Sequence, residues 1–236
     1  MPGRTDSSAT TRRPDAAAPE ARDTRPAPGA GTAPHASTAL PQALKEQGGT
    51  PFPAGERTGV VRPLPARPRY RRQLRRIGAG RVLDIGCGPG DTLVGCAPGS
   101  VGIDHDPRSV HTCRARGLTA YTADAFLASP HARPGAFDAL LCAHVLEHLD
   151  DEQVEGLLRA YLPYVRPGGG VLLITPQEAG HRAEAAPVRF TDFTLLRAFA
   201  ESAGLAVRRT YSYPLPRAAG KLLRRNVFAL VGQVPR

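Results

Sequence analysis

A glycine-rich segment after an apolar stretch is the clearest chemical signal in the sequence. The segment DIGCGPG spans residues 84–90, and the apolar residues of 81–85 lead into it. Glycines at alternate positions let the chain turn sharply and let a ligand approach main-chain N–H groups without interference from a Cβ atom. Open parallel sheets bind their ligands at a turn of this kind, after a strand. The pattern therefore predicts a binding turn.

A second acidic residue narrows the class of ligand. Asp104 ends the next apolar stretch, residues 101–104, and lies 20 residues after Asp84. A carboxylate at this position can accept hydrogen bonds from both hydroxyls of a ribose. Together with the glycine turn, Asp104 indicates a ligand that contains adenosine.

The charge of Asp84 separates two such ligands. NAD would place its pyrophosphate at the glycine turn, and a carboxylate two residues before Gly86 would repel it. S-adenosylmethionine carries an ammonium and a sulfonium, which the same carboxylate attracts. We therefore expect S-adenosylmethionine as the cofactor rather than NAD.

A second group of chemically competent residues is His144, Glu147 and His148. The spacing H-x-x-E-H also occurs in zinc peptidases, and it would place both histidines on one face of a helix. No downstream helix offers an obvious third ligand, so we predict no metal site and keep a divalent metal as an alternative. We expect His148 to act as a general base that accepts the proton of an acceptor hydroxyl.

The elements that must position these residues alternate between strand and helix. Strands are expected at residues 81–85, 101–104, 119–122, 137–142, 171–175, 205–212 and 227–232, and helices at 67–77, 107–116, 151–165 and from Thr191 or Asp192 to Gly204. Continuous apolar strands separated by helices predict a parallel sheet that is covered on both faces. Residues 217–225 are too few for a crossover helix, so the last two strands are expected to be antiparallel. The predicted fold class is α/β, Rossmann-like and doubly wound.

Composition separates the N-terminal part from this pattern. Residues 1–65 are rich in Pro, Ala, Gly, Thr and Arg, and we expect a disordered tail there, before a domain at 66–236. Much of the excess arginine lies in the first 76 residues and in the short patch Lys221, Arg224 and Arg225, so the formal net charge of +10 says little about the domain. The four cysteines lack a C-x-x-C spacing, and neither a secretory segment nor a long apolar run is present. We therefore expect a cytoplasmic protein without a membrane partner.

The sequence resembles the class I S-adenosylmethionine-dependent methyltransferases of the bacterial small-molecule type. The resemblance covers residues 67–236 and rests on VLDIGCGPGDTL (82–93), VGIDHDP (101–107), TADAF (122–126), FDALLCAHVLEHLDD (137–151) and RPGGGVLLITP (166–176). It implies a seven-stranded, mostly parallel sheet with an antiparallel last strand. It also implies transfer of a methyl group to an oxygen, nitrogen or carbon atom of a small-molecule acceptor.

The resemblance also implies the roles of individual residues. Asp84 would hold the amino group of the cofactor, Asp104 its ribose, and Asp124 the amino group of its adenine. The full set of expected cofactor-binding residues is Asp84, Gly86, Cys87, Gly88, Asp104, His105, Asp124, Ala125, Ala143 and His144.

Other functions stay open at this point. A non-catalytic S-adenosylmethionine-binding protein and an NAD-dependent oxidoreductase are alternatives. The basic charge suggests a nucleic-acid methyltransferase, yet no N-P-P-Y-like step or catalytic cysteine pair follows the fourth or fifth strand. Nucleic acid is therefore not expected as a partner, and the acceptor and the oligomeric state stay undetermined.

Overall fold

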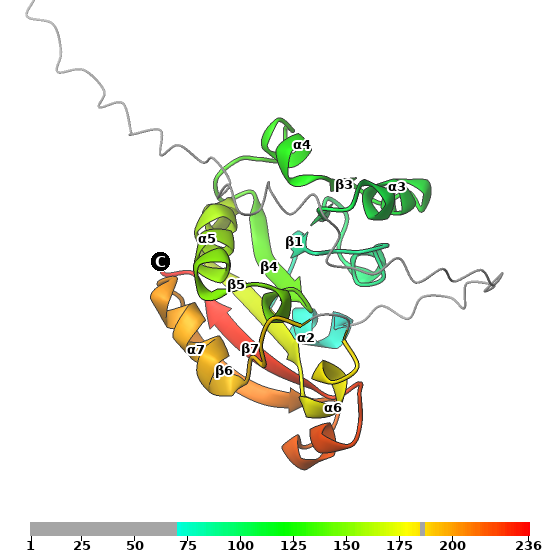
Figure 1. Cartoon of the computed structure of the whole chain (residues 1–236). Coiled ribbons are helices and arrows are strands. Elements are labelled where there is room, and N and C mark those ends of the chain that lie inside the picture. Colours follow the sequence, from blue (N-terminus) through cyan, green and yellow to red (C-terminus); the bar gives the residue numbers. More distant parts are fainter. Residues whose placement is uncertain (1–69, 185–186) are drawn as a thin grey trace, which may run out of the picture. The chain divides into compact units, whose positions relative to one another are not determined.

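Seven strands form a single sheet in the computed structural model of the chain (Figure 1), which describes residues 70–184 and 187–236. The strands are β1 (Val82–Ile85), β2 (Val101–Ile103), β3 (Ala120–Tyr121), β4 (Phe137–Ala143), β5 (Val165–Pro176), β6 (Ala206–Tyr213) and β7 (Val227–Gln233). Their order across the sheet is β3-β2-β1-β4-β5-β7-β6.

Strand direction confirms the predicted fold class. β1 pairs in parallel with β2 and β4, and parallel pairing continues outward to β3 and β5. β7 runs antiparallel to both of its neighbours, β5 and β6. The direction of winding reverses between β1 and β4, and the carboxyl ends of strands at such a point are where doubly wound sheets bind ligands.

Helices connect the strands. The α-helices are α2 (Arg71–Arg76), α3 (Pro107–Ala115), α4 (Ala123–Leu127), α5 (Asp151–Tyr161), α6 (Glu178–His181) and α7 (Phe193–Ser202). Shorter 3-10 turns are η1 (Leu93–Gly95), η2 (Leu146–His148), η3 (Leu162–Tyr164) and η4 (Arg217–Lys221). Within the described part of the chain, none of these helices has the length and apolar character that crossing a membrane would require.

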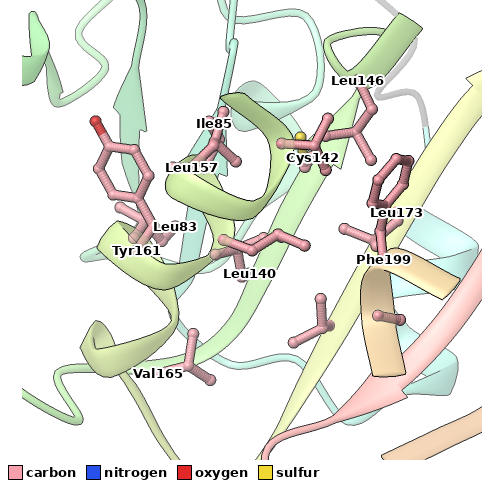
Figure 2. Packing of buried hydrophobic residues seen from close by; sticks show 14 of the residues in the cluster. Leu83, Ile85, Leu140, Cys142, Leu146, Leu157, Tyr161, Val165, Leu173 and Phe199 are labelled. Carbon is pink, nitrogen blue, oxygen red and sulfur yellow. The ribbon is translucent and has the colours of Figure 1, made fainter. Parts of the chain in front are cut away.

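Alternate residues of the strands belong to two hydrophobic clusters, because successive side chains of a strand point to opposite faces. Leu83, Leu140 and Leu173 pack with Leu157 of α5 and Phe199 of α7, as Figure 2 shows. The residues next to them along the chain, Val82, Leu141 and Leu172, pack with Tyr70 and Leu74 at α2. Helices on both faces therefore hold the central strands in place.

Side-chain caps fix where the two helices of the larger cluster begin. The side chain of Asp150 accepts a hydrogen bond from the N–H of Gln153 at 2.8 Å, and Gln153 Oε1 accepts one from the N–H of Asp150 at 2.9 Å. This reciprocal capping box starts α5 immediately after the His144–His148 segment. Asp192 caps α7 by accepting from the N–H groups of Thr194 and Leu195, which confirms the predicted start.

The strand that follows α5 is longer than the sequence indicated. We expected α5 to reach residue 165 and the strand to begin at 171, but α5 ends at Tyr161 and β5 begins at Val165. The glycines at 168–170 are unfavourable for a strand by propensity, yet they are part of β5. Close packing accounts for glycine at position 170, because a Cβ atom there would lie only 3.0 Å from Ile77 Cδ1.

Other differences concern short segments. The sequence did not indicate α4, and α6 lies within the stretch that was expected to be a loop, residues 177–189. The first helix was expected from residue 67; Tyr70, the first described residue, has a φ of 58°, and α2 begins after it. Residues 67–69, the predicted tail at 1–65 and the predicted domain boundary lie outside the described residues.

Candidate cofactor and acceptor site

Asp84 supplies a buried carboxyl group near the carboxyl end of β1. It is 2% exposed, and its Oδ2 has no hydrogen-bond partner among the described residues. Burial, with smaller contributions from Cys113 and Asp104, raises the pKa of Asp84 to about 8. A buried carboxylate without a partner is unfavourable until a cation or a donor reaches it. Asp84 thus has the properties needed to bind a positively charged ligand.

The glycine turn after β1 has room on one side only. Gly86 and Gly88 have φ values of 70° and 53°, which favour glycine. A Cβ atom added to Gly86 would lie 2.3 Å from Val145 Cγ2, whereas one added to Gly88 would meet no described atom within 4 Å. Gly86 therefore allows the turn to pack against the segment after β4, and Gly88 presents its main chain to open space. This arrangement fits a ligand that approaches the turn closely.

Asp104 connects the end of β2 to the same turn. The N–H of Gly88 donates to Asp104 Oδ2 at 2.8 Å, and the N–H of Asp106 donates to Oδ1 at 2.9 Å. These two bonds fix the orientation of the carboxylate, and each oxygen can accept a further hydrogen bond. A pair of hydroxyl groups, such as those of a ribose, is a suitable donor set for it.

The neighbours of these residues differ in where their side chains lie. The side chain of Cys87 packs with Val110, Cys113 and Ala120, so only its main chain is left to face the turn. His105 is half-exposed beside Asp104, with its Nδ1 3.6 Å from Asp104 Oδ1.

Asp124 and Ala125 lie beyond the carboxyl end of β3. Both residues are exposed and belong to the first turn of α4, which begins two residues after the strand. Because β3, β2 and β1 are parallel, these residues lie at the same edge of the sheet as Asp104 and the glycine turn. The expected binding residues of the first three strands are thus at one edge.

His144 takes an unusual backbone conformation directly after Ala143, the last residue of β4. Its φ of 59° is uncommon for a residue other than glycine, and its N–H donates to Ile174 O of β5 at 3.0 Å. The Nε2 atom of His144 lies 2.9 Å from the hydroxyl oxygen of Tyr70. The tight turn therefore places the His144 ring next to Tyr70, the residue before α2. The sequence contained no local signal for this contact, because 74 residues separate the two partners.

Two carboxylates approach the other ring nitrogen. His144 Nδ1 lies 3.4 Å from Glu147 Oε1 and 3.9 Å from Glu184 Oε1. Glu147 is 0% exposed, and neither of its carboxylate oxygens has a hydrogen-bond partner among the described residues. One ligand atom from each of these three residues lies within 4.8 Å of the other two, a grouping that could hold a metal ion.

This grouping removes one reason for expecting no metal, the lack of a third ligand. A third ligand was expected on a downstream helix, whereas Glu184 lies just after α6 in the expected loop. The prediction that His144 and His148 lie on one face of a helix is also wrong. His144 precedes the 3-10 turn η2 and has a left-handed conformation, so His144 and His148 are not one turn apart on an α-helix. His148 is partly buried at the end of η2.

Comparison of the chain with known proteins identifies its family. A family model described as a methyltransferase domain matches residues 61–220, more than half of the chain. The ubiquinone biosynthesis O-methyltransferase of Albidiferax ferrireducens is 30% identical over 130 residues, which are 50% of this chain and 51% of that protein. The protein of the same name from Chromobacterium violaceum is 33% identical over 107 residues, which are 42% of this chain and 45% of that protein. The chain thus spans about half the length of these curated relatives.

Solved structures share the fold. A SAM-dependent methyltransferase from Archaeoglobus fulgidus superposes with a TM-score of 0.51 at 18% identity, covering 69% of this chain and 92% of that one. A putative methyltransferase in complex with the Trm112 activator, from Haloferax volcanii, gives a TM-score of 0.54 at 18% identity, covering 71% and 90%. At this level of identity, the comparison establishes the architecture alone.

Proposed function

Because this chain belongs to the methyltransferase-domain family, we propose that it transfers the methyl group of S-adenosylmethionine to a hydroxyl group of a small molecule. The observation that carries the proposal is the buried carboxyl group of Asp84, which lacks a hydrogen-bond partner, beside a glycine turn with open space at Gly88. Oxygen is the proposed acceptor atom because the relatives named above are O-methyltransferases.

The proposed binding mode follows the order of the strands. Asp84 holds the ammonium group of the cofactor, directly or through a water molecule, and Asp104 accepts hydrogen bonds from the ribose. The remaining contacts come from the glycine turn, the turn after β3 and the end of β4, with residues Gly86, Cys87, Gly88, His105, Asp124, Ala125, Ala143 and His144. The sulfonium makes the methyl group electrophilic, so the protein has to orient an acceptor and exclude water.

We assign the removal of the acceptor's proton to His148. This residue follows the end of β4 and is partly accessible, and histidine exchanges protons near neutral pH. We assign the choice of acceptor to the start of α2 and to residues 177–184, because Tyr70 and Glu184 both lie close to His144.

Binding measurements on Asp104→Ala test the cofactor assignment. A carboxylate that accepts hydrogen bonds from two hydroxyls contributes about 1.5–3 kcal/mol for each bond. We expect the variant to bind S-adenosylmethionine and S-adenosylhomocysteine at least about tenfold more weakly, since both contain the ribose. Glu152→Ala, an exposed substitution on α5, should leave both affinities unchanged, and NAD should not bind measurably to the unaltered chain. Unchanged S-adenosylhomocysteine binding by Asp104→Ala would refute the assignment.

Kinetics of His148→Gln test the role of this histidine. We expect kcat with a hydroxyl acceptor to fall about 10²–10⁴-fold while the affinity for S-adenosylhomocysteine stays within about threefold. Treatment with EDTA should leave the activity of the unaltered enzyme intact. If EDTA abolishes activity, and Mg²⁺ restores it except in Glu184→Gln, proton removal belongs to a cation at His144, Glu147 and Glu184 instead.

A further inference from the structure

A second concave site lies between α2 and β6. The cavity has a volume of about 520 Å³, and it shares no lining residue with the glycine turn or the His144 segment. Its polar lining consists of Gln73 and Arg76 from α2 together with Arg208, Arg209 and Tyr211 from β6. This volume is within the usual range for small-molecule sites, about 300–1,000 Å³.

A β-bulge explains how two consecutive arginines line one cavity. In a regular strand, neighbouring side chains point to opposite faces of the sheet. β6 departs from this rule because Val207 pairs with Gly232 and Arg209 with Val231, which leaves Arg208 as an extra residue. Bulges commonly redirect side chains at functional positions. Here the bulge brings the guanidinium groups of Arg208 and Arg209 to the same side as Arg76.

The three arginines of the cavity form no ion pair with a carboxylate of the described residues. Arg76, Arg208 and Arg209 have no carboxylate oxygen within 4.0 Å among residues 70–184 and 187–236. Neutral groups position two of them: Gln233 Oε1 lies 3.1 Å from Arg208 Nε, and the Tyr211 ring lies 4.6 Å from the Arg209 guanidinium carbon.

Gln73 adds neutral polar atoms to the same lining. This residue is 1% exposed, and neither the nitrogen nor the oxygen of its side-chain amide has a hydrogen-bond partner among the described residues. Buried amides are nearly always hydrogen bonded in folded proteins, so this one needs an explanation. A polar ligand in the cavity would supply one.

We propose that this cavity binds a small anion that carries two or more phosphate groups. Guanidinium groups match phosphate oxygens in geometry and charge, and a polyanion would relieve the repulsion among three fixed positive charges. The arginines meet at one concavity, which suits a small ligand better than a long nucleic-acid backbone. Among the described residues, the exposed large apolar side chains are Val94, Val188, Phe190, Leu215, Leu222 and Leu223. All of them lie outside the lining, so the cavity does not suit a lipid surface.

Calorimetric titration of the full chain with inorganic tripolyphosphate tests the proposal. We expect saturable binding that weakens as salt is raised, and a higher melting temperature in the presence of tripolyphosphate. Arg76→Gln/Arg209→Gln should weaken binding at least about tenfold and abolish the thermal shift. Arg71→Gln/Arg75→Gln is the matched control, because it removes the same charge from exposed positions of α2 outside the cavity. This control should stay within about threefold of the unaltered chain.

Three results would overturn the proposal. The unaltered chain could fail to bind tripolyphosphate, or the control could lose as much affinity as the cavity variant, which would mean general charge attraction. A single-stranded oligonucleotide could bind more tightly than tripolyphosphate and lose that binding in Arg76→Gln/Arg209→Gln. S-adenosylhomocysteine affinity should stay unchanged in both variants, so this test is independent of the proposed methyl transfer.

Discussion

Individual residues at the carboxyl edge of the sheet are held in arrangements that are unfavourable on their own. Asp84 and Glu147 are buried carboxyl groups with oxygens that lack a hydrogen-bond partner among the described residues, and His144 has a left-handed backbone. Such features destabilise a fold and persist where the surrounding structure enforces them, commonly at functional sites. All three lie at or just after the ends of β1 and β4, the edge of the sheet where we propose that the cofactor binds.

The raised pKa of Asp84 predicts that cofactor binding is linked to pH. Below about pH 8 the group is protonated in the free protein, and a cationic ligand favours the ionised form, so binding near pH 7 should release a proton. We expect affinity for S-adenosylhomocysteine to increase as the pH rises from about 6 to about 8. Calorimetry in two buffers of different ionisation enthalpy measures the proton directly.

Asp84→Asn is the control for this measurement. The variant should bind S-adenosylhomocysteine more weakly and release no proton from this position. Equal proton release by the variant and the unaltered chain would show that another group titrates.

The sequence predicted the positions of those candidate site residues that lie at or beside the ends of strands. Asp84, Gly86, Gly88 and Asp104 are recognisable because their distances from strand ends along the chain determine where they lie. The contacts of His144 with Tyr70 and Glu184 depend on how distant segments pack, which no local pattern encodes. The direction of the Cys87 side chain depends on packing against α3 in the same way.

Among the elements, α5 and its cap position the His144–His148 segment. The helix starts at a reciprocal cap between Asp150 and Gln153, and its buried residues Val154, Leu157 and Leu158 join the larger hydrophobic cluster. The sequence predicted a helix that begins at residue 151, and this start is confirmed. Its end was predicted too late, because Pro163 in η3 cannot continue an α-helix and α5 stops at Tyr161.

Asp150→Ala measures how much this cap contributes. Removing an N-cap carboxylate costs about 0.5–2 kcal/mol, so we expect the free energy of unfolding in urea to fall by that amount. Glu152→Ala, in the first turn of the same helix, should change it by less than about 0.5 kcal/mol. A loss of equal size in both variants would mean that the charge near the helix end matters and the capping hydrogen bond does not.

At the scale of the whole sheet, α2 spans two regions with different chemistry. Tyr70 at its start contacts His144 beyond the carboxyl end of β4. Arg76 and Ile77 at its other end line the arginine cavity, beside the first half of β6. The sequence predicted a helix at residues 67–77. It could not indicate the cavity, which depends on a bulge in a strand that lies more than 130 residues further along the chain.

The strand order also has a consequence for how the protein is made. β7 lies between β5 and β6, although the ribosome synthesises both of them first. In the described part of the chain, β6 pairs with β7 alone, so a nascent β6 has no sheet partner until residues 227–233 have left the exit tunnel. Unpaired strand edges are where newly made chains associate with one another. A chain that stops after residue 226, which has β6 but lacks β7, should therefore aggregate more than the unaltered chain, and light scattering measures the difference.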